Sequence, residues 1–175
     1  SFGQGLSMTS LQVLTAVNAI ANDGQMMKPR VVYQIVDGEN VVTSRPAALG
    51  NPISAETANL VTSMMVDAVS EGLDDAAQVP GYTVAGKTGT AQIWGVTDYL
   101  PNAFMMSVVG FLPADDPQIS VLVMLDRPKT GQFASQVVAP IFAQLTSRLV
   151  LQMQIPNDEV RLRLAAEGVS LDPTE

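Results

Sequence analysis

One short segment, AGKTGTAQ, concentrates polar groups of the kind that bind or activate a substrate. It contains a cation, Lys87, followed by the hydroxyls of Thr88 and Thr90, and Gly86 and Gly89 keep it low in bulk. The pattern predicts an extended strand, in which Lys87 and Gly89 project to one side and the threonines to the other. A cation and two hydroxyls suit a carboxylate, and a strand at a sheet edge can pair with a peptide or stabilise an oxyanion. We therefore predict a site for an acylated peptide with a carboxylate end.

Two other interpretations compete for this lysine strand. Gly81 stands five residues before Gly86, so the sequence also matches the phosphate-binding pattern G-x-x-x-x-G-K-[ST]. The intervening YTVA favours a strand, however, and GTAQIWGVTDY does not predict the helix whose N-terminus would hold a phosphate. The second interpretation is purely structural, since Lys-Thr-Gly often occurs by chance, and the triplet alone favours it.

The elements expected around the lysine strand alternate between helices and strands. Before it, the sequence predicts a helix within 7–25 that Ser7 or Thr9 caps and Gly24 ends. A hairpin over 28–44 follows, with its turn at Asp37-Gly38. A loop over 45–52 then leads to a second helix from Ser54 to about Glu71. After the strand over 82–92, it predicts a connection over 93–102 and strands over 103–112 and 118–127 joined by PADDP. A helix over 135–153 that Pro140 starts or kinks follows, and then a short exposed helix in 154–175. This order indicates an α+β domain with an antiparallel sheet flanked by helices.

Composition excludes several kinds of function. The 175 residues suit one domain, and a 47% hydrophobic content argues against disorder. A net charge of −8 argues against a nucleic-acid partner. Cys and His are both absent, which removes thiol nucleophiles, Ser–His–Asp triads and Cys- or His-ligated zinc, so we expect neither a metal nor a cofactor. The longest apolar run, AFMMSVVGFL, is too short for a membrane span, and the opening without Met leads us to expect a fragment or processed piece.

Four separated strings carry a family resemblance. They are FGQGLSMTSLQ, NDGQMMKPRVV, GYTVAGKTGTAQ and NAFMMSVVGFLPADDPQISVLVMLDRP. In this order they resemble the C-terminal part of the transpeptidase domain of class B penicillin-binding proteins, in which K-T-G is a motif. The resemblance covers residues 1–155 and implies the C-terminal portion of a β-lactamase/transpeptidase-like fold. Residues 156–175 are then a C-terminal extension with a short helix and a loose end.

The resemblance implies a peptidoglycan D,D-transpeptidase that cross-links stem peptides through an acyl-serine intermediate and binds β-lactams. In such enzymes a serine attacks the D-Ala–D-Ala bond of the stem peptide and then passes the acyl group to an amine. Lys87 matches the lysine that lines the cleft, and Thr88 and Thr90 match the hydroxyls that bind the substrate carboxylate. The N–H of Thr90 matches part of the oxyanion hole, and Gly89 keeps the strand open to substrate. The predicted catalytic residues are thus Lys87 and Thr90, with Thr88 and Gly89 as further substrate-binding residues.

Other residues that match the family have less specific predicted roles. Phe2, Gly3, Gln4 and Gly5 match a structural turn. Trp94 and Tyr99 follow the lysine strand, where they either contact the substrate or have a packing role.

The sequence departs from the family pattern at the nucleophile. An S-x-x-K motif needs Ser three residues before Lys, but Gln25, Val84 and Asp126 precede the three lysines, and no S-x-N motif is present either. We therefore expect the nucleophile upstream, outside this chain, and this chain alone to be inactive. The predicted partners are the upstream half of the domain, D-Ala–D-Ala stem peptides and β-lactams. The predicted place of work is outside the cytoplasm, with an anchor in an absent N-terminal segment.

Two alternatives remain open at this point. A β-lactamase or β-lactam sensor domain would share the fold, although FGQG and KTGTAQ favour the synthase. The second alternative is a non-catalytic fragment that binds its complementary half.

Overall fold

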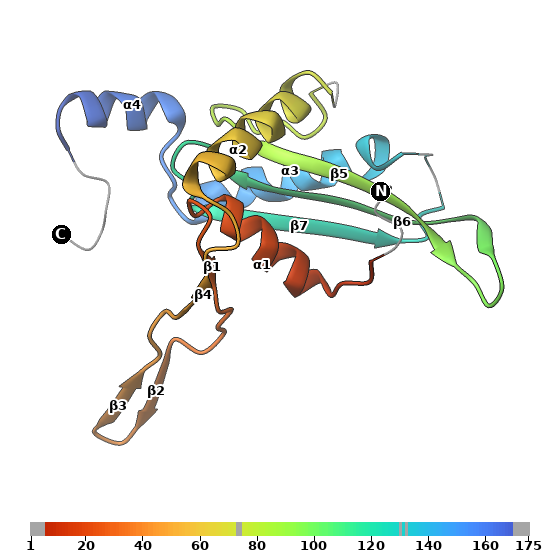
Figure 1. Cartoon of the computed structure of the whole chain (residues 1–175). Coiled ribbons are helices and arrows are strands. Elements are labelled where there is room, and N and C mark those ends of the chain that lie inside the picture. The colour runs from red at the N-terminus through yellow and green to blue at the C-terminus, as the bar shows by residue number, and fades with distance from the viewer. Residues whose placement is uncertain (1–5, 73–74, 130, 132, 170–175) are drawn as a thin grey trace.

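The computed structural model describes residues 6–72, 75–129, 131 and 133–169, so the predicted turn at 2–5 and the predicted loose end at 170–175 lie outside the described residues. The central sheet is antiparallel, with strand order β5-β6-β7 (Figure 1). Its strands are β5 (Ala85–Trp94), β6 (Tyr99–Leu112) and β7 (Ile119–Asp126). Helices α1 (Ser10–Ile20) and α2 (Ala55–Ser70) lie on one side of the sheet and α3 (Ala134–Gln152) on the other. The predicted α+β class is confirmed.

The two helices of the first half begin at predicted caps. Thr9 caps α1 with a capping box, because its hydroxyl accepts from the Gln12 N–H at 3.2 Å while the Gln12 side chain accepts from the Thr9 N–H at 2.9 Å. Ser54 caps α2 by accepting from the Thr57 N–H at 3.2 Å. Both starts therefore follow from local sequence.

A hairpin separates these helices and projects from the body of the domain (Figure 1). Strands β2 (Gln34–Asp37) and β3 (Asn40–Thr43) pair in register, with Gly38 at a positive φ of 59° in the turn, as predicted. The expected loop over 45–52 is wrong in part, because β4 (Ala48–Gly50) pairs with β1 (Met26–Met27) at the base of the hairpin. Strands this short have too few residues for a visible alternation.

The connection expected over 93–102 is also largely wrong, since β5 and β6 continue through most of it. Trp94 pairs with Tyr99 across the strands, and their rings meet edge to face with centroids 4.9 Å apart. The Gly95 N–H donates to the Asp98 carbonyl at 2.8 Å and closes the turn. The aromatic cross-strand contact therefore extends the hairpin beyond the segment whose alternation is clear.

The core lies mainly between the sheet and α3. Phe142 and Val138 of α3 pack against Val108 and Leu112 of β6, and all four are fully buried. Pro140 lies in the interior of α3, not at its first turn, and is exposed. The other helical face of the sheet carries a smaller cluster around Phe111.

The segment after α3 forms the short helix α4 (Asp158–Ala166), as predicted. It is not fully exposed, because Arg161 in it is only 6% accessible. Among the described residues, no helix has the length and apolar content that crossing a membrane requires.

Candidate functional site

The lysine strand lies at an edge of the sheet. Within the described part of the chain β5 pairs with β6 alone, and Lys87 stands opposite Val109 while Thr90 stands opposite Met106. The last turn of α2 passes the start of the strand, where Val69 approaches Gly86. Within the described residues the strand therefore has the edge position in which its outer N–H and C=O groups could pair with a peptide.

The two faces of β5 point toward different helices. Ala85 and its partner Phe111 belong to the cluster packed by α1 and α2, so Lys87, two residues further on, projects to that same face. Thr88 and Thr90 project to the opposite face, where their partners Val108 and Met106 pack with α3. The register between β5 and β6 thus confirms that Lys87 projects to one face and the two threonines to the other.

Lys87 is an exposed cation beside the edge. Its Nζ donates to the carbonyl oxygen of Thr88 at 3.0 Å, and no carboxylate among the described residues forms an ion pair with it. A hollow of about 160 Å³ adjoins it, lined by Ala68, Gly72 and Gly86 together with Lys87 and Thr88. The ammonium is therefore available to an anion arriving at this edge.

Thr90 is tied to the start of α3. Its Oγ1 accepts a hydrogen bond from the N–H of Ala134 at 3.3 Å, and Phe133, the N-cap residue of α3, has no side-chain capping bond. Thr90 therefore takes the place of a local cap. Because a hydroxyl has one proton to donate besides its acceptor sites, this contact orients Oγ1 and leaves its O–H for a ligand carboxylate.

The two glycines of the lysine strand have different neighbours. A Cβ on Gly86 would lie 3.0 Å from Cγ2 of the buried Val69. A Cβ on Gly89 would meet one close atom, the Ser107 hydroxyl oxygen at 2.8 Å. Gly86 thus permits helix packing, whereas Gly89 keeps the surface of the strand low beside a hydroxyl. Sequence reasoning missed Ser107, and only the β5–β6 register could have located it.

Trp94 and Tyr99 lie further along the hairpin. Trp94 is four residues beyond Thr90, roughly 13 Å along an extended strand. It is 59% exposed, and the ring it contacts is Tyr99. Of the two roles that the sequence left open, packing is the one that a contact in the structure supports, namely that between the rings of Trp94 and Tyr99.

Charged groups elsewhere do not extend this site. Arg127 donates to Asp126 at 3.0 Å, and this hydrogen bond lowers the pKa of the Asp126 carboxyl in an exposed pair at the end of β7. A larger hollow of about 340 Å³ beside the C-terminal end of α1 has no residue of β5 in its lining. Within the described ranges no three acidic side chains gather as a metal site.

Comparisons with known proteins show what this chain is similar to. The family model described as "Penicillin binding protein transpeptidase domain" matches residues 1–147. Stage V sporulation protein D of Bacillus subtilis is 40% identical over 149 residues, which is 83% of this chain and 23% of that protein. PbpB of Mycobacterium tuberculosis is 35% identical over 167 residues, covering 88% of this chain and 24% of that protein.

Solved structures give the same result. A crystal structure of penicillin-binding protein 3 from Mycobacterium tuberculosis, complexed with aztreonam, superposes with a TM-score of 0.78 at 32% identity, covering 89% of this chain and 37% of that one. Penicillin-binding protein 2X from Streptococcus thermophilus gives a TM-score of 0.77 at 28% identity, covering 85% of this chain and 24% of that one. The chain spans about a quarter of the length of the curated relatives it matches.

Proposed function

This chain belongs to the penicillin-binding protein transpeptidase family, and from that premise we propose that it provides the lysine strand of a peptidoglycan D,D-transpeptidase. The observation that carries the proposal is an edge strand with an available ammonium on one face and an oriented hydroxyl on the other. The serine nucleophile comes from a part of the transpeptidase other than this sequence, which has no S-x-x-K motif.

The reaction that this strand would support is acyl transfer through serine. The serine oxygen attacks the carbonyl carbon of the penultimate D-Ala, the bond to the terminal D-Ala breaks, and the leaving amine takes a proton. An acceptor amine then attacks the ester, and the serine regains its proton. A β-lactam follows the first half of this path, when its ring amide opens and remains attached as the acyl group.

Each polar group of the lysine strand has a role in these reaction steps. The open edge of β5 pairs with the extended peptide, as in other cases of strand addition. Lys87 supplies positive potential near the substrate carboxylate, and Thr88 and Thr90 donate their hydroxyl protons to it. The Thr90 N–H donates to the oxyanion. Gly89 leaves room for the peptide backbone.

The boundaries and location of the domain complete the proposal. Residues 1–155 form the C-terminal part of the transpeptidase domain, and 156–175 form an extension. The enzyme works outside the cytoplasm on stem peptides ending in D-Ala–D-Ala, in contact with the half that carries S-x-x-K. Several matched relatives are named as peptidoglycan D,D-transpeptidases, which supports this substrate.

Intact mass after incubation with a penicillin tests the proposal in the complete transpeptidase. We expect one penicillin adduct, located by peptide mapping on a serine outside this sequence. Lys87→Ala should lower the acylation rate by roughly 100-fold, the usual effect of removing one electrostatic contact to a reacting group. Lys28→Ala, an exposed lysine near the base of the β2–β3 hairpin, is the matched control and should react as the unaltered protein does.

Two outcomes would contradict the assignment. An adduct on a residue of this chain would require a nucleophile that the proposal excludes. Acylation of Lys87→Ala at the unaltered rate would remove the lysine strand from the site.

A further inference from the structure

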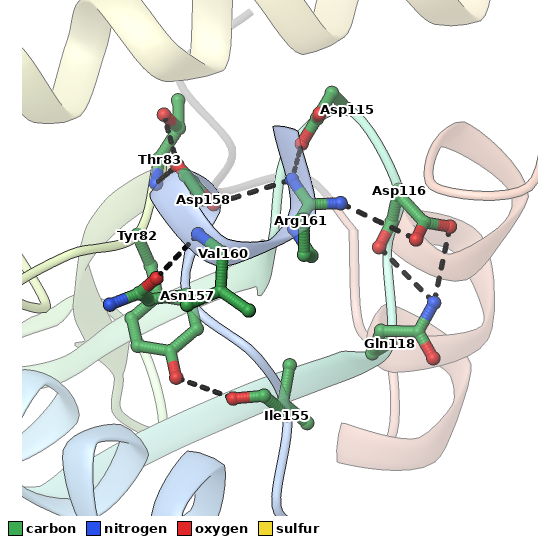
Figure 2. A network of polar contacts seen from close by, with 10 residues as sticks. All are labelled: Tyr82, Thr83, Asp115, Asp116, Gln118, Ile155, Asn157, Asp158, Val160 and Arg161. Carbon is green, nitrogen blue, oxygen red and sulfur yellow. Dashed lines mark hydrogen bonds and ion pairs between the residues drawn. The ribbon is translucent and has the colours of Figure 1, made fainter. Parts of the chain in front are cut away.

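Helix α4 is joined to the segment that leads into β5 by a network of polar contacts (Figure 2). At its centre is Arg161, which is 6% exposed. Its guanidinium forms ion pairs with Asp115, with Asp116 at 3.3 Å and with Asp158 at 3.3 Å. Asp115 and Asp116 belong to the turn between β6 and β7, whereas Asp158 is the first residue of α4. One cation therefore connects two parts of the fold that are distant in sequence.

Asp158 carries this connection to Thr83, four residues before Lys87. One carboxylate oxygen of Asp158 accepts from the Thr83 N–H at 2.6 Å and from the Thr83 hydroxyl at 2.7 Å. On the other side, the carbonyl oxygen of Thr83 accepts from the Ala114 N–H at 2.9 Å. The backbone of Thr83 is thus fixed from both sides just before the lysine strand begins.

The two residues before Thr83 contact the same segment. The Tyr82 hydroxyl donates to the Ile155 carbonyl at 2.6 Å, and the Gly81 carbonyl accepts from the Asp158 N–H at 2.9 Å. Gly81 has a φ of 84°, and a Cβ there would lie 3.3 Å from Cβ of Asn157. Burial and then the negative charge of Asp158 raise the pKa of Tyr82, which keeps its hydroxyl protonated as a donor.

The energetics of this network favour a positioning role over a stabilising one. Burial acts to lower the pKa of Arg161, but the hydrogen bond and charge of Asp115 outweigh it, so the pKa is raised and the cation persists. Its Nε is buried and has no hydrogen-bond partner among the described residues. Desolvation of the buried guanidinium offsets part of its attraction to the more exposed carboxylates, whereas the geometry of the three pairs is specific. The contacts also converge on the segment that precedes the catalytic strand.

We propose that Arg161 is a positioning residue for the lysine strand, because it fixes Asp158 and, through Asp158, the Thr83 backbone that sets where Lys87 and Thr90 lie along the sheet edge. This inference rests on the proposed function of that strand. It assigns to the α4 segment, which lies beyond the residues matched by the family model, an effect on acyl transfer.

The test uses the complete transpeptidase with a fluorescent penicillin. Arg161→Ala should lower the second-order rate constant of acylation by roughly 10- to 100-fold, because small misplacements of reacting groups have effects of this size. The fraction of protein labelled at saturation should not change. Arg161→Lys should not restore the rate, since one ammonium cannot bridge three carboxylates in this geometry. Arg163→Ala, an exposed arginine of the same helix, is the control and should leave the rate unchanged.

A second variant keeps the test valid if Arg161→Ala does not fold. Thr83→Val has nearly the same shape and removes only the hydroxyl contact, so the rate should fall by up to about fivefold, the equivalent of one hydrogen bond. Hydrogen exchange in peptides covering 81–92 gives a readout that needs no penicillin. Arg161→Ala should speed exchange there, while Arg163→Ala should not.

The outcomes separate this inference from the proposed function. If the unaltered protein takes no penicillin, the proposed function fails, and hydrogen exchange alone decides whether Arg161 positions the strand. If the unaltered protein reacts, unchanged acylation in folded Arg161→Ala overturns the inference. A smaller labelled fraction with an unchanged rate constant also overturns it, because that is the signature of a structural role alone.

Discussion

Replacing Gly86 and Gly89 by alanine, one at a time, separates the packing of the lysine strand from its chemistry. Neither glycine has a positive φ, so alanine can adopt both backbone conformations. At Gly86 the new Cβ would lie 3.0 Å from Cγ2 of Val69, and valine in a helix has little rotamer freedom. At Gly89 the contact is with the Ser107 hydroxyl, which can turn away by changing its rotamer.

These contacts give different expected changes in the free energy of unfolding. Overpacking against Val69 should cost about 1–3 kcal/mol, partly offset by about 0.4–1 kcal/mol from the less flexible unfolded chain. Gly86→Ala should therefore destabilise the transpeptidase domain by roughly 1–2 kcal/mol. Gly89→Ala receives the same offset with a smaller clash, so its stability should stay within about 1 kcal/mol of the unaltered domain. Its Cβ would stand on the face and edge where the peptide is proposed to lie.

Urea denaturation of the domain and the rate of acylation by a fluorescent penicillin measure the two effects. We expect Gly86→Ala to lose stability and Gly89→Ala to lose roughly tenfold or more in acylation rate while it remains folded. Val69→Ala and Ser107→Ala are the matched backgrounds, because each removes the atom that the new Cβ meets. In the Val69→Ala background, Gly86→Ala should cause little further loss of stability. In the Ser107→Ala background, Gly89→Ala should still lower the acylation rate. Equal destabilisation by both substitutions, or full acylation by Gly89→Ala, would refute this division of roles.

Three further predictions concern single contacts. Thr90→Val should destabilise the domain by about 0.5–2 kcal/mol in urea, because it removes the acceptor for the first N–H of α3, and Thr90→Ser should not. Phe142→Ala should cost about 3–5 kcal/mol in the same assay, since this side chain is fully buried, and a smaller loss would contradict its place in the core. In an alkaline absorbance titration Tyr82 should ionise late, and Tyr82→Phe should remove that late component, because burial raises its pKa. A group with a raised pKa adds stability that is fully present below its unfolded pKa, about 10 for tyrosine, and is lost as the pH rises through the folded pKa. The difference in stability between the unaltered protein and Tyr82→Phe should therefore shrink in strong alkali.

Local signals in the sequence were enough to predict most helices and strands, including the lysine strand. Thr9 and Ser54 were identifiable as caps because a cap acts on the N–H groups three residues away. The alternation around Lys87 placed it and Thr90 on opposite faces of a strand, as the register with β6 confirms. The extension of the hairpin to Trp94 was missed, because it depends on an aromatic contact across the strands.

What could not be predicted is how the strand is fixed, because those contacts join residues far apart in the chain. Thr83 and Asp158 are 75 residues apart, and Thr90 and Ala134 are 44 apart. No local periodicity indicates either pair. Arg161 is a further example, since a charged residue on a short polar helix is ordinarily exposed and here is buried.

These two long-range contacts restrain an edge strand, which has only one neighbouring strand to hold it in place. A strand with one neighbour leaves half of its backbone groups unpaired on the outer side, which admits a peptide but also leaves the strand free to move. Acyl transfer needs its donors held within about 0.5 Å of the productive geometry. Asp158 fixes the backbone at Thr83, just before β5 begins, and the Ala134 N–H fixes the side chain of Thr90 within β5. Lys87 lies between them on the outer edge that β5 has within the described sheet, so the strand is restrained without occupying the side on which we propose that the peptide pairs.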